Sequence, residues 1–343
     1  MSTQPPLIDK TPALSVIDGP LVDPDLEEDQ QIERRILQVP AILHGERLDK
    51  ALASLLGEFS RSHLQHLIVQ GDVSDAQGQA LIKPSTRVSA GVTLQVSLRP
   101  TEESLAYTPE DMPLNSVYCD EHLRVILKPA GLVVHPAPGH WRGTLLNGLL
   151  ALDPKARALP RAGIVHRLDK DTSGLMMVAR SRPAMDALVQ AIAERRVKRE
   201  YLALVQGRWP HTSLWSLEGA IGRDPKNRLR MAVLADLSSG AKPAQTLIEP
   251  LAQGPAHALL HCRLQTGRTH QIRVHLAHAG FPLVGDELYG GKAWGEMHRQ
   301  ALHAWRLSLR HPITQAELSW TVEPPADMAE CLTPLGLGYN FRQ

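Results

Sequence analysis

The sequence is poor in cysteine and has no long apolar run. Its three cysteines, Cys119, Cys262 and Cys331, are an odd number without C-x-x-C spacing, which excludes a disulfide-rich scaffold and favours a reducing compartment. No apolar run approaches the about 18 residues of a membrane-spanning helix, and the first residues lack a basic segment followed by an apolar one. We therefore expect a cytoplasmic protein that is neither exported nor inserted into a membrane.

An excess of charge of one sign is also lacking, because the formal net charge is only +1. This balance hides an asymmetry, since residues 1–35 hold eight acidic and three basic residues and leave residues 36–343 mildly basic. A mildly basic chain permits an RNA partner without requiring one. Neither a G-x-G-x-x-G nor a P-loop pattern is present, so the sequence does not predict a glycine-rich phosphate cradle.

What is present is a chain of 343 residues with 43% hydrophobic content, which can bury a sizeable core and suggests about two domains. Residues 1–35 contain prolines and acids but no aromatic residue, so we predict a disordered acidic tail. Residues 44–100 combine two short helical patterns, the second capped by Ser60, with a β-rich end, which predicts a small α+β domain. Residues 101–115 are polar and contain prolines, as expected of a linker.

From residue 116 to residue 330 many short β-like runs are interleaved with a few helices. The candidate strands are 125–129, 132–136, 175–180, 200–207 and 257–264. An amphipathic helix is expected to begin near Pro183. Because strands and helices do not alternate strictly, the pattern predicts an α+β fold with a mixed or antiparallel sheet, followed by a C-terminal tail at 331–343.

A run of charge stands between two apolar segments in GIVHRLDKDTSGLMMVAR, residues 163–180. Asp169 lies in this run, on a loop that a rigid scaffold can direct into a cleft. An ionised carboxylate in such a place needs a cation, since desolvation alone would neutralise it. Arg167, Lys170 and the arginines of residues 264–291 are candidates. The alternative is that Asp169 merely caps a turn and that the arginines form surface ion pairs.

Several further motifs accompany this one in a fixed order. They are LKPAGLVVHP, GTLLNGLL, VKREYLALVQG, TGRTHQIRVH, GDELYGG and ALHAWRLSLRHP. Together with HRLDKDTSGLMMVAR they resemble the RluA-type pseudouridine synthases, and in particular the RluD-like branch that acts on large-subunit ribosomal RNA. Residues 47–96 resemble an S4 RNA-binding domain. The resemblance implies a pseudouridine synthase catalytic domain at 116–330 preceded by an S4-like domain.

The resemblance also implies three catalytic residues. Asp169 corresponds to the nucleophile, Tyr201 to the tyrosine of the K-x-E-Y segment, and Arg273 to the arginine of the H-Q-I-R segment. Isomerising uridine involves no redox change, so no cofactor is expected. A carboxylate could attack C1′ of the ribose or C6 of the uracil, or remove a proton at C2′, and the residues leave these routes open. Tyr201 offers a ring on which uracil can stack and a hydroxyl near C5.

Other residues are expected to hold the RNA. The candidate substrate-binding residues are Arg167, His166, Arg268, His270, Arg223 and Arg228. The candidate RNA-binding residues of the S4-like domain are Arg47, Lys50, Arg61, Lys83 and Arg87. Arg167 could fill the space that a flipped base leaves. A zinc site at His270, His275 and His278 is not expected, because their spacing is poor and no glutamate stands at metalloprotease spacing.

The partner implied is RNA, as a stem-loop of 23S ribosomal RNA or a pre-50S particle, with no membrane partner and a monomeric enzyme. A second hypothesis is a non-catalytic RNA-binding ribosome assembly factor built on the S4-like domain. A third is a metal-dependent hydrolase that uses the histidines. A pure binding protein has no use for a carboxylate, a tyrosine and an arginine in separate motifs, so the sequence favours the isomerase.

Overall fold

The computed structural model describes residues 33–98, 104–137, 139–227, 229–235 and 240–341. The chain forms two compact units, residues 1–101 and residues 102–343, and each is described by itself. Residues 1–32 of the expected tail and residues 101–103 of the expected linker lie outside the described residues.

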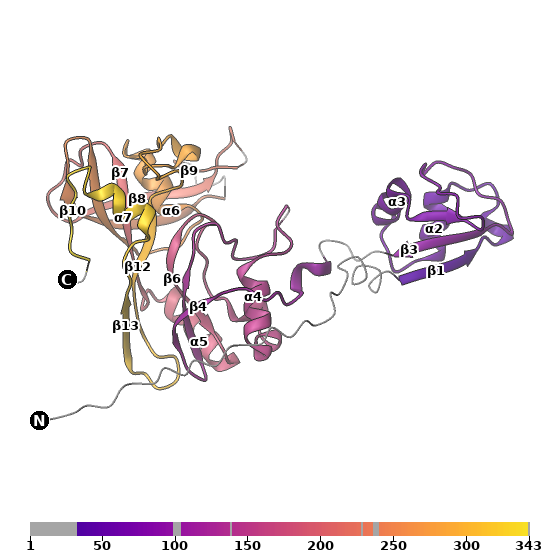
Figure 1. The fold of residues 1–343 in the computed structure, drawn as a ribbon, viewed down its shortest axis with the longest axis horizontal. Helices are drawn as coiled ribbons and strands as arrows, with labels where there is room; N and C mark the ends of the chain where they lie inside the picture. Colours follow the sequence, from indigo (N-terminus) through magenta and orange to yellow (C-terminus); the bar gives the residue numbers. More distant parts are fainter. Residues whose placement is uncertain (1–32, 99–103, 138, 228, 236–239, 342–343) are drawn as a thin grey trace, which may run out of the picture. The chain divides into compact units, whose positions relative to one another are not determined.

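The N-terminal unit is a three-stranded antiparallel sheet, ordered β1-β3-β2, with two helices (Figure 1). Its elements are β1 (Glu33–Gln38), η1 (Ala41–Leu43), α2 (Leu48–Leu55), α3 (Arg61–Gln70), β2 (Val73–Asp75) and β3 (Thr93–Leu98). Leu48, Leu52, Leu64 and Ile68 come from the two helices and form its core. The Ser60 hydroxyl accepts a hydrogen bond from the His63 amide at the start of α3, as the sequence predicts.

The N-terminal unit begins earlier than the sequence suggests. Glu33 and Arg35, which the composition assigned to the tail, lie in β1, and the whole of β1 pairs with β3. Four of the six residues of β1 are polar or charged and none of the six is buried, so this edge strand lacks the apolar alternation that would reveal it. Within the described residues the domain therefore already includes residue 33, and does not begin at residue 44.

The C-terminal unit is built on a ten-stranded mixed sheet in the order β4-β5-β6-β12-β7-β11-β10-β8-β9, with β13 paired to β12. The strands are β4 (Asn115–Cys119), β5 (Leu123–Lys128), β6 (Ser173–Ala179), β7 (Lys198–Gln206), β8 (Trp215–Arg223), β9 (Met231–Leu234), β10 (Lys242–Gln253), β11 (His257–Leu264), β12 (Leu302–Arg310) and β13 (Glu317–Thr321). The helices are η2 (Ser104–Tyr107), α4 (Leu145–Leu152), η3 (Pro154–Ala158), η4 (Pro160–Gly163), α5 (Arg182–Ala193), α6 (Gln271–His278), η6 (Glu287–Tyr289) and α7 (Ala326–Leu332). Among the described strands, β6 and β12 pair in parallel and the other neighbours are antiparallel. The predicted α+β class with a mixed sheet is confirmed.

One predicted strand, 132–136, does not form. The carbonyl groups of Val133 and Val134 instead accept hydrogen bonds from the amides of Leu145 and Leu146, at the first turn of α4. These amides have no partner within the helix, so the apolar segment caps α4 and does not join the sheet.

The central strand β7 separates two cores. Tyr201, Ala203 and Val205 face one core, whereas Leu202 and Leu204 face the other. This alternation follows from the two-residue period of a strand. The first core lies under the pocket described below, so Tyr201 reaches the pocket from the sheet.

Two segments expected to be extended are packed against the C-terminal unit. Leu335 and Leu337, in the expected tail at 331–343, are buried in the second core together with α7. In the expected linker, the carbonyls of Ala106 and Thr108 accept hydrogen bonds from the side-chain amide of Asn147 in α4. Both segments therefore belong to the folded unit. No helix among the described residues is both long enough and apolar enough to span a membrane.

Candidate active site

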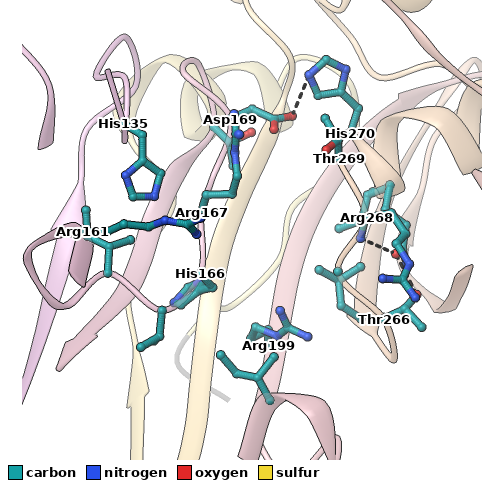
Figure 2. Close-up of a pocket in the computed structure, with 18 of the residues that line it drawn as sticks. His135, Arg161, His166, Arg167, Asp169, Arg199, Thr266, Arg268, Thr269 and His270 are labelled. Atoms are coloured by element: carbon teal, nitrogen blue, oxygen red, sulfur yellow. Dashed lines mark hydrogen bonds and ion pairs between the residues drawn. The ribbon is translucent and has the colours of Figure 1, made fainter. Parts of the chain in front are cut away.

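A pocket of about 850 Å³ opens on one face of the C-terminal unit (Figure 2). One side is lined by the loop between η4 and β6, which carries His166, Arg167 and Asp169. The opposite side is lined by residues 264–273, which connect β11 to α6. Tyr201 of β7 also lines it. Motifs that lie far apart in the sequence thus meet at one cavity.

The loop that carries Asp169 is held by hydrogen bonds to its backbone. The Thr172 amide donates to the Asp169 carbonyl at 3.1 Å, which closes a turn. The buried ammonium of Lys128 donates to the carbonyl of Lys170 at 2.9 Å. Arg299 donates to the carbonyl of Asp171 at 2.9 Å. Burial lowers the pKa of Lys128 to about 8. The loop is therefore fixed by cations that touch its backbone and leave the Asp169 carboxylate to other partners.

Arg273, on α6, binds two carboxylates. Its Nη1 donates to Oδ2 of Asp169 at 3.0 Å, and its Nε and Nη2 donate to the two oxygens of buried Asp286 at 2.8 and 2.9 Å. Burial opposes the charged form of Arg273, but the hydrogen bonds and charge of Asp286, followed by Asp169, raise its pKa overall. The guanidinium also lies 4.9 Å from the ring centre of Tyr289. Arg273 is thus a permanent cation fixed from both sides.

The second oxygen of Asp169 has a different environment. The hydrogen bond and ion-pair contacts of this carboxylate fall on Oδ2, and within the described residues Oδ1 accepts no hydrogen bond. The Asp169 side chain is 17% exposed and lines the pocket. One oxygen is therefore bound to a cation, while the other is available to a molecule in the pocket.

His270 is the second side chain in contact with the Asp169 carboxylate, since its Nε2 lies 3.9 Å from Oδ2. Its Nδ1 is 2.8 Å from the Tyr289 hydroxyl, which also accepts a hydrogen bond from the Met231 amide at 2.9 Å. This arrangement suits donation from the tyrosine hydroxyl to Nδ1, with the ring proton of His270 on Nε2 and directed at Asp169. Burial lowers the pKa of His270, which favours the neutral ring.

Tyr201 is buried beneath the pocket. Burial raises the pKa of its hydroxyl to about 12, against an opposing effect of the positive charge of Arg199. The hydroxyl is consequently protonated at neutral pH, and its ring faces the cavity that Asp169 also lines.

The structure brings together some of the predicted substrate-binding residues and not others. His166, Arg167, Arg268 and His270 line the pocket. His166 is half-buried, its Nε2 accepts a hydrogen bond from the Met177 amide, and desolvation of its ring lowers its pKa to about 3. Arg223 is exposed at the end of β8 and is not among the residues that line the pocket. Arg228 lies outside the described residues.

The predicted RNA-binding residues of the N-terminal unit divide into two groups. Arg47 and Arg61 both bind the buried carboxylate of Asp49, at 3.0 and 2.7 Å. Lys50 lies 3.9 Å from Glu46, and Arg87 donates to the Gly45 carbonyl. Lys83 is exposed. The arginines next to Asp49 therefore have a partner within the fold, whereas the lysines face solvent.

Sequence reasoning did not assign the residues that support the ion pair. Asp286 and Tyr289 both lie in GDELYGG, a motif recognised for its position in the chain and not for the chemistry of its side chains. Lys128 likewise lies in LKPAGLVVHP. An acid beside a tyrosine in a glycine-flanked segment is the signal from which Asp286 could have been found.

Comparison with known proteins shows the family to which the chain belongs. The model of the RNA pseudouridylate synthase family matches residues 122–278. A ribosomal large subunit pseudouridine synthase D of Neisseria meningitidis serogroup A is 46% identical over 331 residues, covering 92% of this chain and 86% of that protein. The protein of the same name from Nitrosomonas europaea is 46% identical over 304 residues, covering 86% of both.

Among solved structures, human RNA pseudouridylate synthase domain containing 1 superposes with a TM-score of 0.50 and 26% identity, covering 64% of this chain and 87% of that one. The chain therefore belongs to the RNA pseudouridine synthases, a class of isomerases, and within them to the RluA-type family and its RluD-like branch.

Proposed function

We propose that this chain isomerises specific uridines to pseudouridine in large-subunit ribosomal RNA, in a stem-loop of 23S rRNA or a pre-50S particle. The observation that carries this proposal is the Asp169 carboxylate, bound through Oδ2 to Arg273 and open through Oδ1 to a pocket of about 850 Å³. The names of the relatives from Neisseria meningitidis and Nitrosomonas europaea support the choice of RNA.

The site supplies the groups that the isomerisation needs. The N1–C1′ bond of uridine must break, the ring must turn, and a C5–C1′ bond must form while C5 loses a proton and N1 gains one. Asp169 acts as the nucleophile or base of the first step, and Arg273 holds its Oδ2 through an ion pair at 3.0 Å. Tyr201 provides a ring for the uracil to stack on, and its hydroxyl is the group placed to handle the proton at C5.

The target base must leave its stack before it can enter this pocket. Arg167 is exposed, lines the pocket and lies two residues before Asp169, so it is placed to fill the gap that the base leaves. Arg268 and His270, on the opposite side, are placed to contact the flipped nucleotide. We assign Lys50, Lys83 and Arg87 of the S4-like unit to contacts with the RNA backbone.

We further propose that the enzyme acts as a monomer in the cytoplasm. Asp169, Tyr201 and Arg273 all come from one chain, and the three cysteine thiols are free. A non-catalytic assembly factor is the weaker candidate, because binding alone gives no reason to keep a reactive carboxylate in a cavity.

The proposal is tested with the full-length protein and a transcribed 23S rRNA fragment labelled with tritium at C5 of uridine. Isomerisation replaces the C5 proton, so we expect time-dependent release of tritium from a small number of uridines per fragment. Sequencing after carbodiimide treatment then locates the modified positions. RNA binding without any tritium release, on fragments covering the whole large-subunit RNA, would favour the assembly factor.

A further inference from the structure

Arg199 is a buried arginine for which no carboxylate partner is found among the described residues. It is only 8% exposed and it lines the pocket. Within the described residues its guanidinium forms no ion pair, and its Nε has no hydrogen-bond partner. A buried charge without a partner costs folding free energy, so a fold that retains one favours a role in binding an anion.

The position of Arg199 directs it toward the substrate. It precedes Tyr201 by two residues on β7, so the two side chains lie on the same face of the sheet. A Cβ atom added to Gly267 would lie 3.0 Å from Nη1 of Arg199, which places the guanidinium against the backbone of the opposite pocket wall. Figure 2 shows Arg199 between the segment of His166 and the segment of Thr266.

The cluster of Asp169, Arg273 and Asp286 has no positive charge to spare for the substrate. Arg273 is shared by two carboxylates, Asp169 and Asp286, so the cluster has no positive charge left for an anionic intermediate. The other arginines that line the pocket are exposed or half-buried, namely Arg161, Arg167, Arg195 and Arg268. Arg199 is thus the pocket-lining arginine, within the described residues, that combines burial with the absence of a carboxylate partner.

Resting on the proposed function, we propose that Arg199 is a catalytic residue that binds the carbonyl oxygens of the target uracil and stabilises the negative charge of the ring. When the N1–C1′ bond breaks, its electron pair stays on N1 and spreads to O2 and O4. At the same time C1′ gains a bond to an Asp169 oxygen, or C2′ gives a proton to it. If Asp169 instead adds to C6, the displaced electrons reach O4.

Negative charge therefore appears on the uracil oxygens by every one of these routes. When C5 bonds to C1′, the Asp169 oxygen leaves or returns its proton, C5 loses a proton and N1 gains one, so nothing is oxidised or reduced. A guanidinium suits this task because it stays charged when buried and presents parallel N–H donors that can follow a turning ring. Such a fixed donor in a site shielded from water acts more strongly than one in water.

The test compares Arg199→Met and Arg199→Lys with Arg196→Gln in single-turnover reactions on tritiated RNA. Arg196 is exposed, and it is paired with Glu194 at 2.6 Å, so its variant removes one nearby positive charge outside the pocket. We expect Arg199→Met to lower the rate at saturating RNA by about 100-fold, with Arg199→Lys intermediate and Arg196→Gln like wild type. RNA affinity should be unchanged in all three.

Stability provides a second readout. Because Arg199→Met removes an unpaired buried charge, its Tm should equal or exceed that of wild type. A structural role predicts the opposite, namely a lower Tm with a normal rate per folded molecule, and that result would overturn the proposal. If Arg199→Met does not fold, the rate of Arg199→Lys per folded molecule decides: a lowered rate supports the proposal, and a rate equal to that of wild type overturns it.

RNA that contains 5-fluorouridine distinguishes an interaction of Arg199 with the uracil ring from an interaction with the phosphates of the backbone. Fluorine withdraws electrons and stabilises the detached ring anion, so the rate loss of Arg199→Met, measured as consumption of 5-fluorouridine, should be smaller than with uridine. Weaker RNA affinity and a reduced salt dependence at an unchanged rate would show that Arg199 binds a phosphate, which contradicts the proposal. Wild type that releases no tritium would instead contradict the proposed function itself.

Discussion

The two units each contain a carboxylate beside arginine, arranged in opposite ways. In the N-terminal unit Asp49 is fully buried and is bound by two arginines, Arg47 and Arg61. In the C-terminal unit one arginine, Arg273, serves two carboxylates, and Asp169 keeps an oxygen open to a pocket. The carboxylate of the N-terminal unit is thus fully bound by partners within the fold, which we call the saturated cluster. The carboxylate of the C-terminal unit keeps one oxygen open to the pocket, which we call the incomplete cluster.

This difference separates a carboxylate whose donors all belong to the fold from a carboxylate that keeps one oxygen open to a pocket. Gln65 also donates to Asp49, at 2.6 Å, so this carboxylate has as many donors as it can use within the fold. Hydrogen bonds from Arg47 lower the pKa of Asp49 against the effect of burial, and those from Arg61 and Gln65 lower it further. A carboxylate held in this way stabilises the helix pair, whereas a carboxylate with an open oxygen is able to react.

The largest expected effect is on catalysis at the incomplete cluster. Asp169→Asn should lower the rate at saturating RNA by about 1000-fold or more, because the amide keeps the shape but is not a nucleophile. Tritium release measures the reaction rate, and Tm measures the stability, which should change little. The matched control is Asp171→Asn in the same loop, whose backbone contact with Arg299 is retained. Substantial residual activity of Asp169→Asn would exclude it as the nucleophile.

At the saturated cluster the expected effect is on stability. Asp49→Asn should destabilise the N-terminal unit by about 2 kcal/mol, because it removes the charge-assisted hydrogen bonds that Arg47 and Arg61, whose side chains are partly exposed, make to a buried carboxylate. Faster hydrogen exchange in α2 and α3, measured by mass spectrometry, should report this loss, while the rate at saturating RNA stays the same. The control is exposed Glu46→Gln. Unchanged exchange would show that Asp49 is not the centre of this unit's stability.

The same residue predicts a pH dependence. Because the pKa of Asp49 is lower in the folded unit than its ordinary value of 3.8, its contribution to stability is present above that value and is lost as the pH falls below it. Acid should therefore increase exchange in α2 and α3 of wild type. The Asp49→Asn variant should show less of this pH dependence, because it has no carboxylate to protonate.

A smaller effect is expected from changing the balance within the catalytic cluster. Asp286→Asn leaves Asp169 as the one carboxylate on Arg273, so the guanidinium should shift and hold Asp169 in a less reactive position. We expect the rate to fall by about 100-fold, the cost of a small misplacement, with little change in RNA affinity. Glu287→Gln, at the exposed neighbouring position, is the control. A normal rate for Asp286→Asn would mean that Asp286 serves stability alone.

The smallest effect distinguishes the cations of the N-terminal unit. Lys83→Gln should weaken RNA binding a few-fold and reduce the slope of affinity against salt by about 1, since an exposed lysine can neutralise a phosphate. Fluorescence anisotropy with labelled RNA at several salt concentrations measures both. Arg61→Gln should change stability more than the salt slope, because Arg61 is bound to Asp49. The reverse pattern would show that Arg61 leaves Asp49 to bind RNA.

The local features of the fold could be predicted, because they depend on residues that are close together in the sequence. The helices α2, α3 and α5 follow from apolar spacing and from capping residues such as Ser60 and Ser181. Strands β7 and β11 follow from runs of β-favouring residues. The segment 132–136 was mistaken for a strand because an apolar run looks alike in a strand and in a buried loop. The C-terminal segment at 331–343 shows neither the helical nor the strand periodicity of apolar residues, although Leu335 and Leu337 are buried.

The site was predictable only as far as its motifs. The arginines of residues 264–291 are among the predicted partners of Asp169, and Arg273 of that segment forms an ion pair with it at 3.0 Å. The contacts of Asp286, Lys128 and Arg199 depend on which strands become neighbours in the sheet. No local pattern encodes that choice, so these residues could not be assigned from the sequence.

The parallel pairing of β6 with β12 also determines when the site can form during synthesis. The Asp169 loop is held by Arg299 and Gln300, and Ser173 bonds to His303, so its support arrives more than a hundred residues after the loop itself. A growing chain must therefore leave the ribosome almost completely before the carboxylate is fixed in place. The N-terminal unit, whose contacts are close in sequence, can fold much sooner. In a nascent chain the N-terminal unit can thus be complete well before the Asp169 loop receives its support.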